Sequence, residues 1–182
     1  MRKRFLQVIS VFLICIMFLA GCVRKTGESG DDNGKKADNA TLNIVTSFYP
    51  VYIATINVAG DIPGVTVENM TKPQTGCLHD YSLTPEDLKK LEKADVFVIN
   101  GAGMESFLDD LKSQLDNLKI VEASKDIELL KDSNGEENGH IWVSISNAIT
   151  SVYNIAYQLA TIDKLNADRY IENADAYAGK LK

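Results

Sequence analysis

The sequence predicts an α/β fold, in which a mostly parallel four-stranded sheet is flanked by helices and the chain ends in a long helix. Two observations predict it. After residue 41, apolar runs of strand length alternate with segments of helical periodicity, the pattern of a parallel sheet covered by helices. The run at 95–100 is apolar on both faces, which suits a strand buried inside such a sheet.

The expected strands are short apolar or alternating runs, and they lie at 42–47, 65–70, 95–100 and 119–124. The expected helices lie at 51–60, 84–94, 104–118, 146–162 and 166–182. Thr84 should cap the second helix, with Pro85 at its first position and Asp87 where a capping box places an acid. The last helix has no expected partner, although it carries an apolar face of Tyr170, Ala174, Tyr177 and Leu181.

Length and composition are those of an ordinary globular chain. The 182 residues suit one domain with some excess, and 45% of them are hydrophobic and 24% charged. The formal net charge is −6, whereas a nucleic-acid partner requires a basic face. We therefore expect no nucleic acid among the partners.

The first residues have the features of an export signal. Three basic residues at 2–4 precede an apolar run at 5–20, which is about 16 residues and shorter than the ~20 of a spanning helix. The sequence Leu-Ala-Gly-Cys that ends at Cys22 resembles a bacterial lipobox. We therefore expect residues 1–21 to be a lipoprotein signal peptide and Cys22 to be acylated, which places an exported chain on the outer face of the cell membrane with the lipid bilayer as a partner.

The segment 22–40 is polar and contains no aromatic residue, so we expect a flexible tether that leads from the lipidated cysteine to the globular part. The chain has three cysteines. Cys15 belongs to the signal and Cys22 to the lipid anchor, which leaves Cys77 without a partner for an internal disulfide.

The sequence contains two histidines, and each follows an expected strand. His79 lies in the loop after the second strand and His140 in the loop after the fourth. Ligands gather at the carboxyl ends of parallel strands, so the two imidazoles can face one another and share a metal ion. Two unrelated surface histidines are the alternative. We find no phosphate-binding glycine loop and no third group to support a Cys77/His79 nucleophile, and we expect no enzyme.

Four motifs together are similar to one known family. They are SFYP at 47–50, HDYSLTP at 79–85, ADVFVINGAGME at 94–105 and HIW at 140–142. From residue 42 to 182 the chain resembles the metal-binding lipoproteins of bacterial zinc and manganese ABC importers, the cluster A-I (cluster IX) substrate-binding proteins. The resemblance implies one lobe of a two-lobe solute-binding protein, with a metal-binding N-terminal lobe at 41–162 and the start of an inter-lobe linking helix at 163–182. The C-terminal lobe is absent from the sequence, which indicates a truncated product, a split gene or a fragment.

The resemblance also implies roles for individual residues. His79 and His140 correspond to the metal ligands of the N-terminal lobe. Positions that hold the ligand loops in order or wall the cleft correspond to Asp80, Tyr81, Trp142 and Tyr49. Cys77 has two interpretations: a thiolate ligand, or a small apolar residue packed under the loop, and the second is favoured.

The implied function is capture of a divalent metal ion and its delivery to an ABC permease in the membrane. The transported ligand would be Zn²⁺, which imidazole ligands favour, or Mn²⁺. Because zinc needs about four ligands, two imidazoles alone should bind it weakly. The alternatives are a manganese-specific member of the same family, a surface adhesin, and an exported zinc hydrolase that would need a third ligand and a general base.

Overall fold

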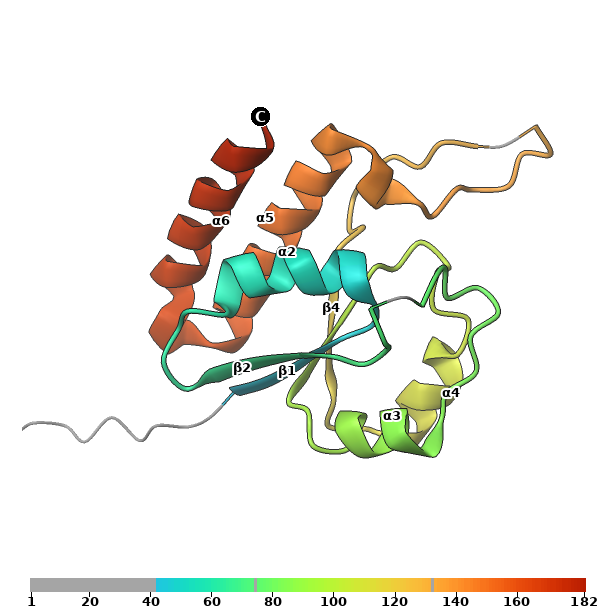
Figure 1. Cartoon of the computed structure of the whole chain (residues 1–182), viewed down its shortest axis with the longest axis horizontal. Helices are drawn as coiled ribbons and strands as arrows, with labels where there is room; N and C mark the ends of the chain where they lie inside the picture. Colours follow the sequence, from blue (N-terminus) through green and yellow to red (C-terminus); the bar gives the residue numbers. More distant parts are fainter. Residues whose placement is uncertain (1–41, 74, 132) are drawn as a thin grey trace, which may run out of the picture. The chain divides into compact units, whose positions relative to one another are not determined.

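The computed structural model describes residues 42–73, 75–131 and 133–182, and the expected signal peptide, Cys22 and tether lie outside the described residues. The described part contains one parallel sheet with the strand order β2-β1-β3-β4. The strands are β1 (Leu42–Thr46), β2 (Val65–Asn69), β3 (Val96–Ile99) and β4 (Lys119–Glu122). The expected α/β class, with its four parallel strands, is confirmed (Figure 1).

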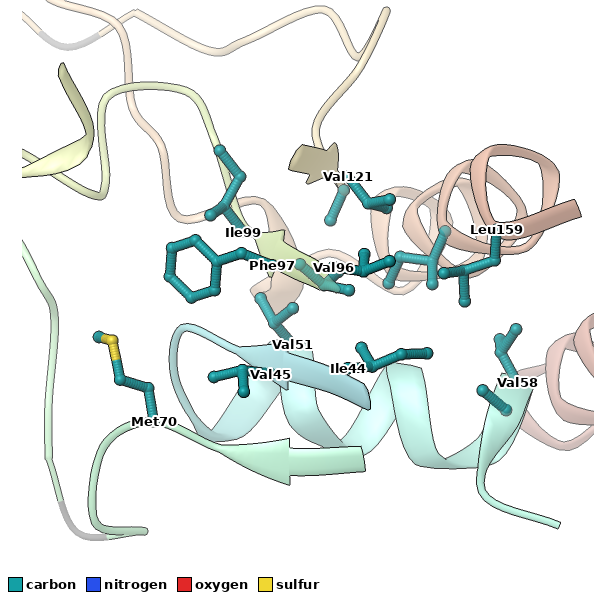
Figure 2. Close-up of a cluster of buried hydrophobic side chains, with 14 of the residues drawn as sticks. Ile44, Val45, Val51, Val58, Met70, Val96, Phe97, Ile99, Val121 and Leu159 are labelled. Carbon is teal, nitrogen blue, oxygen red and sulfur yellow. The ribbon is translucent and has the colours of Figure 1, made fainter. Parts of the chain in front are cut away.

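The two central strands provide the middle of the core. All four residues of β3 are buried, as the apolar sequence at this position predicts. In the β1–β3 register Ile44 lies opposite Val96 and Val45 opposite Phe97, and all four side chains are at most 4% exposed. Figure 2 shows these side chains with those of the neighbouring helices. Burial of this apolar surface is the main favourable contribution to folding.

The helices lie on both sides of the sheet (Figure 1). Helices α2 (Tyr49–Ala59), α5 (Ile145–Ile162) and α6 (Ala167–Leu181) pack against one another on one side, and α3 (Pro85–Leu91) and α4 (Leu108–Gln114) lie on the other. Two short 3₁₀ turns, η1 (Ile141–Val143) and η2 (Lys164–Asn166), precede α5 and α6. No helix in the described ranges combines the length and apolar character that crossing a bilayer requires.

Helix α4 is shorter than the expected segment 104–118. The chain makes a tight turn after β3, in which Gly101, Ala102 and Gly103 all have positive φ angles. The side chain of Glu105 then accepts hydrogen bonds from the backbone N–H groups of Asn100 and Gly101, so this stretch closes the turn and α4 begins only at Leu108. The expectation that residues 104–118 form one helix is therefore wrong at both ends.

The expectation that the last helix has no partner is also wrong. Tyr170, Ala174 and Ala178 on α6 are at most 1% exposed, and α6 packs against both α5 and α2. Asn173 donates a hydrogen bond to the carbonyl of Val58 at the end of α2 (2.9 Å). Helix α6 is therefore part of the same packed layer.

Candidate metal centre

His79 and His140 lie together at the carboxyl edge of the sheet. Each follows an edge strand, β2 or β4, and their ring centroids are 5.5 Å apart with 52° between the ring planes. His79 is exposed and His140 is partly buried. The expectation that the two imidazoles face one another is confirmed, and their role as metal ligands stays a prediction.

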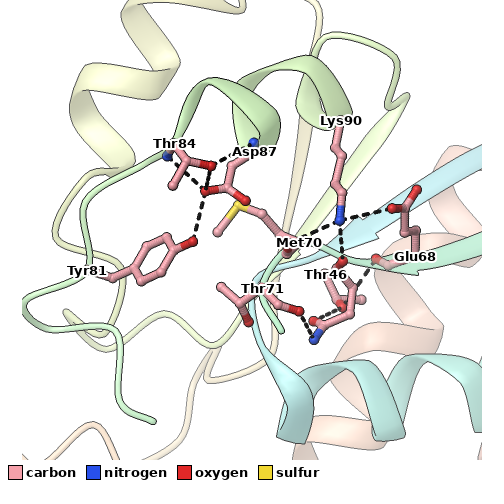
Figure 3. Close-up of polar contacts among 9 residues, drawn as sticks. Thr46, Glu68, Met70, Thr71, Tyr81, Thr84, Asp87 and Lys90 are labelled. Carbon is pink, nitrogen blue, oxygen red and sulfur yellow. Dashed lines mark hydrogen bonds and ion pairs between the residues drawn. The ribbon is translucent and has the colours of Figure 1, made fainter. Parts of the chain in front are cut away.

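The loop that carries His79 is fixed on both sides of the histidine. The preceding residue, Leu78, is fully buried, and its carbonyl accepts a hydrogen bond from the backbone N–H of Tyr81 (3.1 Å). The Tyr81 hydroxyl in turn donates to Asp87 Oδ2 (2.8 Å). Asp87 and Thr84 form the expected capping box at the start of α3, so the loop is tied to a helix N-terminus (Figure 3).

Tyr81 therefore stabilises the loop that carries His79. Burial, followed by its hydrogen bond to Asp87, raises the pKa of Tyr81 to about 12. Its ring lies edge-on to Phe107, with 6.2 Å between the ring centroids. The structure thus shows Tyr81 holding the loop, and its contribution to a cleft wall stays a prediction.

The loop that carries His140 is fastened to the end of β3. The side-chain amide of Asn100 donates to the carbonyl of Gly139 at 3.0 Å, and Asn100 is 1% exposed. Gly139 itself approaches the backbone of Ala102 so closely that an added Cβ would lie 2.6 Å from the Ala102 carbonyl oxygen. Any larger residue at 139 would therefore push the two loops apart.

The His140 imidazole has partners on several sides. Its Nδ1 atom lies 2.7 Å from Asn138 Oδ1, and its Nε2 atom lies 3.0 Å from Cys77 Sγ. Trp142 lies beside it, with 5.1 Å between ring centroids, and packs edge-on against the buried Phe48. Trp142 therefore flanks the histidine, and its role in a cleft wall stays a prediction.

Cys77 does not pack under the loop, so that interpretation is wrong. Its side chain is exposed and contacts His140, while the next residue, Leu78, takes the buried position. In this loop the leucine enters the core and the cysteine faces solvent. Its role as a ligand stays a prediction.

The two remaining site residues are less closely associated with the histidines. Tyr49 is the first residue of α2 and is 42% exposed. Its ring lies 6.3 Å from that of Tyr52, measured between centroids. Asp80 is exposed, and within the described residues no hydrogen bond holds its carboxylate. The role of Tyr49 in the cleft wall and that of Asp80 as a carboxylate that orders the ligand loop stay predictions.

Three residues around the His140 loop were not among the sequence candidates. Asn100 bonds to Gly139, Glu105 holds the backbone of Asn100, and Asn138 contacts His140. Asn100 and Glu105 belong to the NGAGME motif, where two polar residues surround a glycine turn. Burial raises the pKa of Glu105, while hydrogen bonds from the Asn100 and Gly101 backbone oppose that rise. Among the described residues, no three His, Cys, Asp or Glu side chains are already arranged to hold a metal ion.

The chain matches one known protein family over most of its length. The family model described as "Zinc-uptake complex component A periplasmic" matches residues 44–182. The chain belongs to this zinc-uptake component A family. The match covers the whole described sheet except its first two residues, together with both histidines and all five helices named above.

The relatives of this chain differ in the metal that their names give. The manganese-binding lipoprotein MntA of Halalkalibacterium halodurans is 31% identical over 176 residues, which cover 94% of this chain and 55% of that protein. The iron-binding protein YfeA of Yersinia pestis is 30% identical and is matched over 100% of this chain and 58% of its own length. The zinc-binding lipoprotein AdcA of Streptococcus pneumoniae is 32% identical. The match covers 93% of this chain and 34% of AdcA.

Solved structures show the same fold. The crystal structure of Zn(II)-bound AdcA from Streptococcus pneumoniae superposes with a TM-score of 0.69 and 35% identity, over 78% of this chain and 30% of that one. The metal-dependent lipoprotein YcdH from Bacillus subtilis gives a TM-score of 0.68 and 31% identity. This superposition covers 78% of this chain and 52% of YcdH. The chain spans about half the length of most of the relatives it matches.

Proposed function

We propose that this protein is an extracytoplasmic solute-binding lipoprotein that captures a divalent metal ion and delivers it to an ABC import permease. The observation that carries the proposal is the convergence of His79 and His140 at one rim, with their ring centroids 5.5 Å apart. The function is binding and release, without a chemical reaction. Membership in the cluster A-I class of such proteins is part of this proposal.

Two neutral imidazole nitrogens would occupy half of a tetrahedral zinc shell, at Zn–N distances of about 2.0–2.1 Å. We propose Cys77 as a third donor from this chain, because its sulfur approaches Nε2 of His140. Their 3.0 Å separation is shorter than the roughly 3.5 Å between an N and an S donor on one tetrahedral zinc, so the Cys77 loop would move by about half an ångström.

Zinc is the metal that these donors favour. Imidazole suits zinc and thiolate is a soft ligand, whereas manganese prefers carboxylates and water. The relatives named for manganese and iron show that the family context does not by itself choose the metal. Our preference for Zn²⁺ over Mn²⁺ therefore rests on the side chains of this chain.

The membrane part of the proposal rests on the N-terminal sequence. Removal of residues 1–21 and acylation of Cys22 would tether the sheet domain to the outer face of the membrane, where it can meet a permease. The names of several relatives contain the word lipoprotein, which agrees with this arrangement. Growth in labelled palmitate, with Cys22→Ser as the control, tests the anchor.

Calorimetric titration tests the metal site itself. The full chain, purified in detergent without a polyhistidine tag, is titrated with Zn²⁺ and with Mn²⁺ and compared with His79→Ala, His140→Ala and the double variant. We expect each single variant to bind zinc at least tenfold more weakly and the double variant to show no binding. Ser82→Ala, an exposed position in the same loop, is the matched control. Unchanged zinc binding by the double variant would contradict the proposal.

A further inference from the structure

The side chain of Asn138 makes two contacts with one residue. Its Oδ1 atom lies 3.0 Å from the backbone nitrogen of His140 and 2.7 Å from Nδ1 of the same residue. Asn138 is itself exposed, and its backbone N–H donates to the carbonyl of Leu130 at 2.8 Å. The backbone bond fixes the position of Asn138, while the side chain is directed at the histidine.

The backbone contact decides which side-chain atom faces His140. A backbone N–H can only donate, so the atom of Asn138 that receives it must be the amide oxygen and not the amide nitrogen. That same oxygen lies against Nδ1, and an amide oxygen can only accept. The proton of the neutral imidazole therefore resides on Nδ1, and the lone pair is on Nε2.

The other side of the ring agrees with this assignment. Nε2 lies 3.0 Å from the Cys77 sulfur, whose thiol proton the Nε2 lone pair can accept. A neutral imidazole free in water prefers the opposite tautomer, with its proton on Nε2. Asn138 thus reverses the intrinsic preference of the ring and leaves Nε2 available as a donor atom on the side of Cys77.

We infer that Asn138 is the positioning residue that makes Nε2 of His140 the metal-binding nitrogen, an inference that rests on the proposed function. A histidine ligand whose second nitrogen is held by an acceptor has a fixed ring orientation and a stronger donor atom. Loss of such a partner typically weakens metal binding by about 10–100-fold. Asn138 touches no metal ion itself and acts through His140.

The tautomer can be measured without any metal. With two histidines in the chain, imidazole ¹⁵N–¹H correlation spectra at a pH where both rings are neutral contain few signals, and His79→Ala assigns them. We use Cys77→Ala as the background so that the thiol does not also hold the ring. We expect His140 to carry its proton on Nδ1 in this background, to change to the Nε2-protonated form with Asn138→Ala, and to keep the Nδ1 proton with Asn138→Asp. No change with Asn138→Ala would overturn the inference.

Zinc titration of the full chain then tests the consequence. We expect Asn138→Ala to bind zinc about 10–100-fold more weakly, and Asn138→Asp, which restores the acceptor, to remain within about threefold of the parent. Ser133→Ala, at an exposed position of the same loop, should bind like the parent. Equal zinc affinity of Asn138→Ala and the parent would overturn the role of Asn138. A parent that binds no zinc would instead contradict the proposed function. In that case the tautomer measurement alone would decide the inference about Asn138.

Discussion

Asn100 joins the end of the central strand β3 to the residue that precedes His140. Its side-chain amide donates to the carbonyls of Gly101 (2.9 Å) and Gly139 (3.0 Å), and its side chain is almost wholly inaccessible to solvent. The loop after β4 is thereby fixed to the loop after β3. The position of His140 depends on a buried amide that makes no contact with the imidazole.

Asn100→Ala should weaken both the fold and the proposed metal site. The two carbonyls would lose their donor in a buried setting, which should lower the free energy of unfolding by about 1–3 kcal/mol. The freed His140 loop should also reduce zinc affinity. Urea unfolding and zinc titration measure the two effects. Asn57→Ala removes a similar side-chain hydrogen bond to a carbonyl inside α2, and it should leave zinc affinity unchanged. An equal loss of zinc affinity in both variants would contradict this role of Asn100.

Glu105→Gln should destabilise the turn after β3. Both carboxylate oxygens accept a backbone N–H, one from Asn100 (2.8 Å) and one from Gly101 (3.0 Å). Glutamine offers one oxygen and places an NH₂ group against the other donor, so the free energy of unfolding should fall by about 1–3 kcal/mol. Glu128→Gln, at an exposed position, should change it by less than about 0.5 kcal/mol. Chemical denaturation distinguishes the two outcomes.

The stability of the chain should also depend on pH through Glu105. Burial raises the pKa of Glu105 in the folded state above its unfolded value. The stability from this group is therefore fully present below the unfolded pKa and is lost as the pH rises through the folded pKa. We expect the free energy of unfolding to decrease across that window in the parent and to be flatter in Glu105→Gln. Parallel slopes for the two proteins would show that Glu105 is not the responsible group.

Leu78→Ala should affect the other histidine. Leu78 is fully buried beside His79, and its truncation would leave a cavity that costs about 2–5 kcal/mol. The loop would lose its anchor, so we also expect weaker zinc binding at temperatures where the variant is folded. Leu130→Ala is the matched control, because Leu130 is 78% exposed and should contribute little. Thermal unfolding gives the comparison, and equal midpoints for both variants would refute the anchoring role.

The sequence predicted the features that depend on local pattern. The apolar run at 96–99 and the Thr84–Asp87 capping box appear where periodicity and cap residues placed them. The meeting of His79 and His140 was also predictable, because parallel strands bring their carboxyl ends to one edge of the sheet. These inferences need only the chain order and the period of the side chains.

Features that depend on contacts between distant segments were not predictable. The bond from Asn100 to Gly139 joins residues 39 positions apart, and no periodicity signals it. The expectation that a helix begins at 104 was wrong because the Glu105 side chain closes the preceding turn, and α4 begins only at Leu108. For Cys77 the choice between core and surface depended on its neighbour Leu78, since both residues are apolar enough for either position.

Cobalt substitution should reveal whether Cys77 binds metal. Co²⁺ replaces Zn²⁺ in tetrahedral sites, and a thiolate ligand gives it a sulfur-to-cobalt charge-transfer band in the near ultraviolet. In the full chain with Cys15→Ser and Cys22→Ser, Cys77 is the one remaining thiol. We expect this band on cobalt addition because Cys77 Sγ lies 3.0 Å from Nε2 of His140.

Adding Cys77→Ser should abolish the charge-transfer band, while the visible d–d bands of histidine-bound cobalt persist with lower intensity. Zinc affinity should fall more than manganese affinity, because a hydroxyl replaces a soft ligand that zinc prefers. Cobalt bound with d–d bands but without charge transfer in the parent would show that the imidazoles bind metal and the thiol does not. The sulfur would then serve only as a hydrogen-bond partner that holds the Nε2 side of His140 when no metal is bound.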